Sequence, residues 1–364
     1  MKQPITACIM TRDEQDNIES CIDSLKPYVM EIVILDTGSE DATLEIASNK
    51  GVSIYKTVWK NDFSLIRNEL IKLARQPVIL MIDADEIAIP GQGLAFKAAC
   101  DYILQNNSYV GKLNIQNATD EGEITTASIS RMFNKTSGVF YRGIIHEQIE
   151  SHLKQLEFFH TDITLAHSGY LTTKLISKNK LDRNLSLLLK ELDRNIDDSY
   201  LLFQIGRTYS VAGDIEKALV YLKKAYSLSI EDYSFHSTLT QVYGWTLLKG
   251  KRFQELFEVL KEAIQLYPDY TDLYFLYGCT LVEIRSVEFA HLIPGIFQSC
   301  IELGEPDPQK YESILGVGTF KARYNLGLYY ELLGDKKRAY EEYTISAKAN
   351  FKPALDRLSQ ISES

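Results

Sequence analysis

Residues Val78 to Glu86 read VILMIDADE, and this stretch decides the fold of the N-terminal part of the chain. Its apolar residues form a short run that is typical of a buried strand in a parallel sheet. The run ends in Asp83-Ala84-Asp85, and residues two apart on a strand point to the same side. Two carboxylates there repel each other unless a positive group lies between them, such as a divalent cation with oxygen ligands. Asp is also common in turns, so an ordinary turn is the alternative interpretation.

Two further apolar segments upstream have the same form. Residues 5–10 (ITACIM) are followed by the polar tetrapeptide TRDE (11–14) and a helical pattern over 17–25. Residues 31–36 (EIVILD) are followed by a Gly/Ser-rich turn that can cap a helix over 42–49. This alternation of strand, turn and helix predicts βαβ units, a parallel sheet, and a phosphate-bearing ligand at the carboxyl ends of its strands. Neither Gly-x-Gly-x-x-Gly nor Gly-x-x-x-x-Gly-Lys-Ser/Thr follows a strand, which argues against dinucleotide and P-loop sites.

Downstream of about residue 175 the pattern becomes helical, with Tyr, Leu, Ala and Gly at the spacing of a 34-residue helix-turn-helix repeat. The residues that fit this template are Gly206, Tyr209, Ala218, Leu222 and Ala225, then Gly244, Leu256, Leu260, Ala263 and Pro268, and finally Gly327, Tyr330, Ala339 and Tyr343. Gly278 and Ala290 keep the register in a degenerate repeat, and Gly213-Asp214 and Gly334-Asp335 are expected turns. Such repeats stack into a continuous core. A plain helical bundle is the alternative.

Composition limits the class of protein. The 364 residues predict two or three domains, and a hydrophobic content of 45% is enough for real cores. The net charge of −10 argues against a nucleic-acid partner, because such proteins usually carry a basic face. The five cysteines are odd in number and lack a Cys-x-x-Cys pair, as expected of reduced core residues in the cytosol. Neither a secretory signal nor a membrane-spanning apolar run is recognisable, so we expect a cytoplasmic protein without a membrane span.

Several motifs together resemble the family 2 glycosyltransferases, which have the GT-A fold. They are TRDE (11–14), LDTGS (35–39), NDFSLIRN (61–68) and DAD (83–85). RGIIHE (142–147) and HSGY (167–170) resemble the bacterial branch in which tetratricopeptide repeats follow the transferase domain. Within that branch, the order and spacing are most similar to the sublancin-type bacteriocin peptide glycosyltransferases, which modify Cys or Ser. The resemblance covers essentially the whole chain.

The resemblance implies an α/β GT-A transferase domain with a Rossmann-like mixed sheet, followed by an all-α tetratricopeptide-repeat domain. We predict the transferase domain over 1–174, a connecting helix over 175–195 and the repeat domain over 196–364. The implied ligands are a divalent metal, Mn²⁺ or Mg²⁺, and a UDP-sugar donor, with UDP-glucose and UDP-N-acetylglucosamine as the leading candidates.

The resemblance also assigns roles in donor binding. Asp85 is implied to be the direct metal ligand, and Asp83 is implied to lie near the ribose. Asp36 resembles the residue that accepts a hydrogen bond from the uracil ring. Arg67 matches a family arginine near the base; the alternative is a surface arginine paired with Glu69 or Glu14.

The turn that follows the expected strand 5–10 is a further part of the expected nucleotide site. Thr11, Asp13 and Glu14 lie in this turn, against which the nucleoside would rest. Asp13 stands where relatives usually have Asn, so the contact that it makes is left open.

An acceptor hydroxyl needs a base, and a carboxylate within hydrogen-bond reach can remove its proton. Glu147 is the candidate, because it follows the expected strand 139–142 and matches the family's His-Glu pair. The alternative is a structural ion pair with Arg142 or Arg131. His146 is expected to orient Glu147 or to contact the diphosphate.

Two other residues are candidates with open alternatives. His167 is the candidate to complete the metal shell, because imidazole suits Mn²⁺; an ordinary hydrogen-bonded histidine is the alternative. Arg131, on an expected strand, is a candidate for phosphate contact.

Three functions remain open. The first is an inverting, metal-dependent transfer of a hexose or N-acetylhexosamine to Cys or Ser of a small bacteriocin-like peptide, bound partly by the repeat domain. The second is transfer by the same fold to a polysaccharide or a lipid-linked glycan, and the third is a non-enzymatic repeat scaffold. Aromatic residues of the repeats are candidate peptide anchors, although most are expected in the core: Tyr200, Phe203, Tyr243, Trp245, Tyr274 and Phe275. Because repeat domains often dimerise, a homodimer is also among the expected partners.

Overall fold

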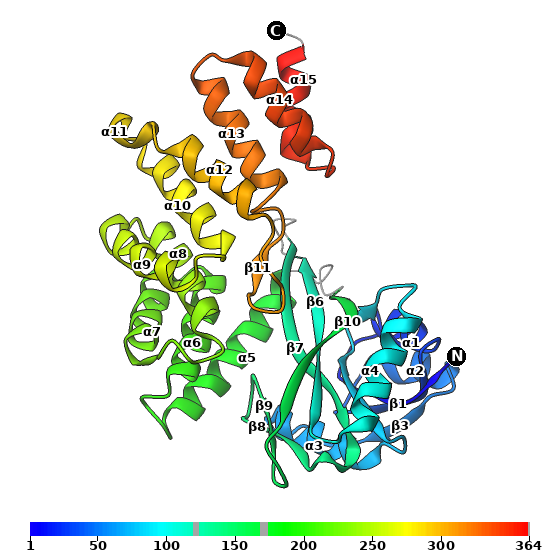
Figure 1. Cartoon of the computed structure of the whole chain (residues 1–364). Coiled ribbons are helices and arrows are strands. Elements are labelled where there is room, and N and C mark those ends of the chain that lie inside the picture. Colours follow the sequence, from blue (N-terminus) through cyan, green and yellow to red (C-terminus); the bar gives the residue numbers. More distant parts are fainter. Residues whose placement is uncertain (119–123, 168–173, 363–364) are drawn as a thin grey trace. The chain divides into compact units, whose positions relative to one another are not determined.

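A computed structural model describes residues 1–118, 124–167 and 174–362. The chain divides into two compact units, Met1–Arg194 and Asn195–Ser364 (Figure 1). The predicted motif residues Ser168, Gly169 and Tyr170 lie outside the described residues.

The first unit is built on a mixed sheet with the strand path β3-β2-β1-β4-β7-β6-β10-β5. Its parallel part consists of β1 (Gln3–Thr11), β2 (Val29–Asp36), β3 (Ser53–Lys56) and β4 (Val78–Asp83). The strands predicted over 5–10 and 31–36 are thereby confirmed. Because β1 lies between β2 and β4, the three predicted strand ends lie next to one another.

The remaining strands of this path extend the sheet with mixed pairing. They are β5 (Glu86–Ala88), β6 (Tyr109–Ala118), β7 (Ile124–Asn134) and β10 (Glu157–His167). β7 is antiparallel to both β4 and β6, whereas β10 is parallel to β6 and antiparallel to β5. A separate two-stranded ribbon, β8 (Val139–Arg142) with β9 (Gln148–Ser151), carries the loop 143–147 between its strands.

Both faces of the sheet are covered, as the near-continuous apolar strands require. One core lies beneath α1 (Ile18–Leu25), α2 (Thr43–Asn49) and α4 (Gly93–Gln105). The other core lies beneath α3 (Phe63–Leu73) and β8. The strand residues alternate between the two cores: Ile5, Ala7 and Ile9 face the first, and Cys8 faces the second. All five cysteines of the chain are free, and four of them are buried.

Helix α5 (Lys174–Leu192) corresponds to the predicted connecting helix, and its contacts place it in the first unit. Its last turn reaches the loop between β8 and β9, where the Glu191 carboxylate accepts a hydrogen bond from the Ile144 backbone N–H at 3.0 Å. The Arg183 guanidinium lies over the Phe63 ring at 5.6 Å. The connecting helix therefore supports the loop that carries Glu147.

The second unit consists of antiparallel helix pairs. Its elements are α6 (Ser199–Ala212), α7 (Ile215–Leu228), α8 (His236–Lys249), α9 (Phe253–Leu266), α10 (Thr271–Ile284), α11 (Val287–Ala290), α12 (Ile293–Leu303), β11 (Ser313–Ile314), α13 (Phe320–Leu332), α14 (Lys336–Ala347) and α15 (Lys352–Ser362). The degenerate repeat is the one in which α11 and α12 together follow α10. The predicted turns are present: Gly213 and Gly334 have φ near +80°, and the aspartate after each caps the next helix.

The repeat glycines lie where two helices touch, as their spacing predicted. A Cβ on Gly206 would lie 2.6 Å from the Leu222 side chain, and one on Gly278 would lie 2.7 Å from the Phe297 ring. Gly327 meets Tyr343 in the same way, at 2.5 Å. Glycine is therefore required by close packing rather than by an unusual backbone conformation.

Candidate active site

The carboxyl ends of β1, β2 and β4 form one edge of the sheet, and the predicted donor residues gather there. Register pairs Thr11 with Asp36 and Met10 with Asp83, so these positions are neighbours across three strands. The site is therefore created by the parallel part of the sheet, where open α/β sheets bind ligands.

Asp36 is buried and its carboxylate is fully occupied by hydrogen bonds from its own surroundings. Oδ1 accepts from the Thr11 hydroxyl at 3.2 Å and from the Ser39 hydroxyl at 2.5 Å, and Oδ2 accepts from the backbone N–H groups of Gly38 and Ser39 at 3.0 Å. This arrangement fixes the turn after β2. The hydrogen bond from the uracil ring to Asp36 stays a prediction. A uracil N–H would have to share the carboxylate oxygens with the donors of the turn.

The two turns that follow β1 and β2 are connected by side chains. Asp13, with φ of +53°, accepts a hydrogen bond from the Glu40 backbone N–H at 2.8 Å, and its own N–H donates to Ser39 Oγ at 2.9 Å. The Glu14 backbone N–H donates to Thr43 Oγ1 at 2.8 Å. Asp13 therefore acts as a turn residue, and an aspartate there tolerates the left-handed backbone better than most residues do.

Asp83 at the end of β4 is held by two buried arginines. Its carboxylate accepts from Arg67 Nη2 at 2.9 Å and from Arg131 Nη2 at 2.7 Å. Burial alone would raise the pKa of Asp83, but Arg131 and Arg67 outweigh it and hold this pKa well below its usual range. The two arginines therefore favour the ionised form of the Asp83 carboxyl group.

The charge network extends beyond Asp83 on both sides. Arg67 Nε donates to Glu147 Oε1 at 2.6 Å, and both side chains are about nine-tenths buried. Arg131 Nη2 also donates to Glu86 Oε1 at 2.9 Å, and burial raises the pKa of Glu86 to about 7. The order is thus Glu147, Arg67, Asp83, Arg131, Glu86, an alternation of charges that compensates the cost of burial.

These contacts correct the two alternative interpretations of Arg67 and Glu147. Arg67 is not a surface residue paired with Glu69 or Glu14, because it is buried against Asp83 and Glu147. The partner of Glu147 is Arg67, rather than Arg142 or Arg131. Arg142 instead pairs with Glu150 at 3.2 Å on the surface.

The network leaves polar atoms without partners among the described residues. They are Arg67 Nη1, Arg131 Nε and the hydroxyl of Tyr141, whose ring lies 5.5 Å from the Arg67 guanidinium. A buried donor without an acceptor is costly. Each of these atoms can therefore donate to an oxygen-rich ligand or to an ordered water. Tyr141 was not anticipated from the sequence, where it reads only as an aromatic on an expected strand.

Asp85 makes a different contact from Asp83, although the spacing predicted that both would point the same way. β4 ends at Asp83, and Ala84 and Asp85 form a turn before β5. The turn directs the Asp85 carboxylate to His167 on β10, with 2.8 Å between Oδ2 and Nε2. His167 reaches this position because β5 and β10 pair directly, with His167 opposite Glu86.

His167 is oriented by hydrogen bonds at both ring nitrogens. Nδ1 lies 3.0 Å from the Asn117 side-chain oxygen, while Nε2 faces Asp85. The hydrogen bond to Asp85 raises the pKa of His167 above its ordinary value, against the opposing effect of burial.

His146 lies beside Glu147 in the loop between β8 and β9, but its side chain is exposed and its backbone has φ of +53°. The loop itself is fixed, since the Phe63 N–H donates to the Ile144 carbonyl at 2.8 Å. The role predicted for His146 stays a prediction.

Comparisons with known proteins agree with this geometry. Residues 6–109 match the model of glycosyl transferase family 2, and residues 199–229 match a tetratricopeptide repeat. Over 290 residues the chain is 30% identical to the SPbeta prophage-derived glycosyltransferase SunS of Bacillus subtilis, covering 78% of this chain and 68% of that protein. Over 228 residues it is 28% identical to a TPR repeat-containing protein of Synechococcus elongatus, covering 60% of this chain and 56% of that relative.

Among solved structures, residues 41 to the end of MamA from Desulfovibrio magneticus are similar, with a TM-score of 0.38. That match is 20% identical and covers 52% of this chain and 91% of the other.

Proposed function

This chain belongs to glycosyltransferase family 2, and on that premise we propose that it transfers a hexose or an N-acetylhexosamine from a UDP-sugar to Cys or Ser side chains of a small peptide, in the cytoplasm and with inversion. The observation that carries the donor half is the pair of contacts at the end of β4. Asp83 is locked between two buried arginines, and Asp85 meets His167 at 2.8 Å.

The Asp85–His167 pair fits a divalent cation, Mn²⁺ or Mg²⁺. A carboxylate oxygen and an imidazole nitrogen are both suitable donors for Mn²⁺, which would replace the proton that the pair shares. Among the described residues, no group of three or more His, Cys, Asp or Glu could hold a metal. A cation held by this pair would take its remaining ligands from substrate phosphates and water, as Mg²⁺ commonly does. Such a cation would neutralise the charge that grows on the departing diphosphate.

The residues around this pair bind and orient the donor. We propose that Asp83 accepts a hydrogen bond from the ribose with the part of its carboxylate that remains accessible, because its side chain is 33% exposed despite the two arginines. Arg67 Nη1 and Arg131 Nε are available to donate to donor oxygens. Thr11 and Asp36 shape the floor of the nucleoside site through the turn that they fix.

Glu147 is the proposed base. Arg67 Nε donates to Oε1 of its carboxylate, and we assign the acceptance of the proton to the other oxygen, Oε2. A serine hydroxyl depends on such a base, whereas a cysteine thiol with a pKa near 8.5 is already a few per cent thiolate at neutral pH. Glu147→Gln should therefore slow serine transfer more than cysteine transfer on peptides that differ only at that position. Equal losses would show that Glu147 positions Arg67 and does not act as the base.

The acceptor half rests on the repeat unit and on the family resemblance. Helical repeats offer extended surfaces for peptides. Among the described residues, none of the helices is both long and apolar enough for a membrane crossing. The experiment that tests the proposal measures UDP release from a panel of UDP-sugars with Mn²⁺ for the wild type, for Asp85→Asn and for the matched surface variant Asp101→Asn. We expect release from one donor, lost in Asp85→Asn and kept in Asp101→Asn. The absence of release from every donor, with and without a Cys/Ser peptide, would refute it.

A further inference from the structure

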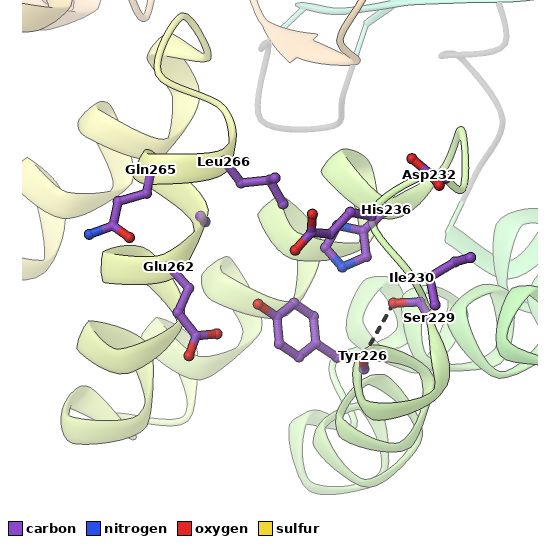
Figure 2. A pocket seen from close by; sticks show the side chains of 10 residues that line it. Tyr226, Ser229, Ile230, Asp232, His236, Glu262, Gln265 and Leu266 are labelled. Atoms are coloured by element: carbon purple, nitrogen blue, oxygen red, sulfur yellow. Dashed lines mark hydrogen bonds between the residues drawn. The ribbon is translucent and has the colours of Figure 1, made fainter.

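The repeat unit contains a pocket of about 730 Å³ that lies apart from the donor residues in the sequence. Figure 2 shows it between the end of α7, the following loop and the end of α9. Its lining residues are Tyr226, Ser229, Ile230, Glu231, Asp232, His236, Glu262, Ala263, Gln265 and Leu266.

The pocket is negatively charged. Glu231, Asp232 and Glu262 line it, and neither lysine nor arginine does. The carboxylates of these three residues form no salt bridge with any cation of the described residues. Two helices, α7 and α9, end at the pocket and direct the negative ends of their dipoles towards it, while one helix, α8, begins there. An uncompensated charge of this kind favours a cationic ligand.

Aromatic rings form the base of the pocket. The Tyr226 and His236 rings are stacked, with centroids 5.5 Å apart and planes at 28°. His236 is 94% buried, and its Nδ1 lies 2.7 Å from the Tyr267 hydroxyl. Figure 2 shows Glu262 of α9 on the side of the pocket that faces Tyr226. Rings beside carboxylates are the surroundings in which proteins hold ammonium and guanidinium groups.

His236 is the second observation that points to a ligand. Its Nε2 has no hydrogen-bond partner among the residues that the structure describes, although the side chain is almost fully buried and lines the pocket. Burial lowers the pKa of His236, so the ring is neutral near pH 7. In the tautomer whose Nδ1–H donates to the Tyr267 hydroxyl, Nε2 presents a lone pair to a donor in the pocket; in the other tautomer, Nε2–H is itself a donor.

A bare metal ion is a poorer occupant than an organic cation. Among the described residues, no cluster of three or more potential ligands has the geometry for a metal. The carboxylates are exposed and spread around a pocket of about 730 Å³, far larger than one coordination shell. Its size suits the end of a long side chain together with part of the backbone that carries it.

We infer that this pocket binds a lysine or arginine side chain of the peptide acceptor, next to an extended segment of that peptide. The identity of the ligand as the acceptor peptide rests on the proposed function. The positive charge of the ligand is inferred from the pocket alone. It gives the repeat unit a definite task, which is to select acceptors that carry a basic residue away from the modified Cys or Ser.

The test uses the full chain and four fluorescein-labelled peptides. Two have a Gly/Ser background with either two lysines or two arginines, and the others carry N-acetyl-lysine or citrulline at the same positions. Binding is measured by anisotropy for the wild type, for the double variant Glu231→Gln/Glu262→Gln and for Glu258→Gln. Glu258 is an exposed residue on α9 that does not line the pocket; its substitution removes one negative charge, whereas the double variant removes two.

We expect the wild type to bind the charged peptides about five- to tenfold more tightly than the uncharged ones, as a few exposed charge pairs allow. The double variant should lose this difference and Glu258→Gln should keep it, and added salt should weaken binding of the charged peptides alone. Equal affinity of the wild type and the double variant for the lysine peptide would overturn the inference, as would equal affinity for lysine and acetyl-lysine.

The outcome is separable from that of the proposed function. Release of UDP from the donor depends on Asp85 and should be the same in the double variant as in the wild type. Charge-dependent binding in a chain that releases no UDP would support the pocket and refute the transferase. UDP release together with charge-independent peptide binding would support the transferase and refute the inference about the pocket. Circular dichroism of each variant verifies that the exposed substitutions leave the fold unchanged.

Discussion

At the scale of single residues, Arg67 is the centre of the candidate active site. It contacts Asp83 and Glu147, which lie 16 and 80 positions away in the sequence. The two carboxylates raise the pKa of Arg67 further, although its burial opposes this. The arginine therefore supplies a fixed positive charge between two acidic side chains.

Arg67→Ala should destabilise the protein by about 3–5 kcal/mol, because it leaves Glu147 buried without its partner and Asp83 with one arginine. Urea unfolding measures the loss. The control is Arg142→Ala, which breaks an exposed pair with Glu150 and should cost less than about 1 kcal/mol. Similar losses for the two variants would show that the buried network contributes no more than a surface pair.

Asp272 in the repeat unit allows a test of pH dependence. It is fully buried; Oδ1 accepts from Gln241 Nε2 at 3.1 Å and from the Ile314 backbone N–H at 2.9 Å. Among the described residues its Oδ2 has no partner. Burial raises the pKa of Asp272 to about 7, whereas an unfolded Asp has a pKa near ~3.9.

Because the folded pKa lies above the unfolded one, the folded state binds this proton more tightly. The resulting contribution to stability is complete below about pH 4 and is lost as pH rises through about 7. Relative to the wild type, Asp272→Asn should therefore gain stability between these values, by at most about 1.4 kcal/mol per pH unit.

Thermal unfolding at pH 5 and pH 8 measures this gain. Asp269→Asn is the control, because the hydrogen bond from Lys310 lowers the pKa of Asp269, so its removal should give no gain at pH 8. A constant difference between Asp272→Asn and the wild type at both pH values would contradict the prediction.

At the scale of elements, the strands, helices and repeat glycines could be predicted from the sequence because each depends on a local period. The alternation of apolar strands with helical segments predicted β1, β2 and β4, and the 34-residue spacing predicted Gly206, Gly278 and Gly327 at close contacts. These features repeat along the chain, so residues that are close in the sequence are sufficient to predict them.

The contacts of the site could be predicted only in part, because they depend on which strands become neighbours. Asp85 and His167 meet because β5 pairs with β10, a pairing between segments about eighty residues apart. Arg131 on β7 likewise reaches Asp83 because β7 pairs with β4, whereas Arg67 on α3 and Tyr141 on β8 come from elements outside this sheet. The sequence identified the chemical groups, whereas the topology decided which of them pair.

Gly278→Ala tests the close packing of the degenerate repeat. The added methyl would lie 2.7 Å from the Phe297 ring, and overpacking of this kind costs about 1–3 kcal/mol. The matched control is Gly295→Ala in α12, where the methyl meets nothing within 4 Å and where alanine favours the helix. Melting temperature should fall for Gly278→Ala and stay equal or rise for Gly295→Ala. A fall for both would mean that glycine matters through the backbone and not through packing.

At the scale of the whole molecule, the division into two units predicts how a ligand acts on stability. A ligand that binds only the folded state at one hundred times its Kd stabilises by about 2.7 kcal/mol. UDP with Mn²⁺ should therefore slow hydrogen exchange in the slowest amides of 1–194 by up to about a hundredfold. Amides of 195–364 should exchange at unchanged rates, and Asp85→Asn should abolish the effect.

An equal slowing of hydrogen exchange in the amides of 195–364 would contradict the expectation that the two units unfold separately. Protection in Asp85→Asn equal to that in the wild type would instead show that nucleotide binds without this carboxylate.

The hydrogen bond from Ile144 to Glu191 has a consequence for how such chains can be recombined. Helix α5 precedes the repeats in sequence, yet its last turn supports the loop that carries Glu147. A chimaera that exchanges repeat units between relatives at residue 174 would exchange this support as well, and would pair a foreign helix with the native loop. A junction after Arg194 keeps the loop and its support together. In an ancestry of such fusions, α5 would be inherited with the catalytic half, and the repeats beyond it would be free to change with the acceptor.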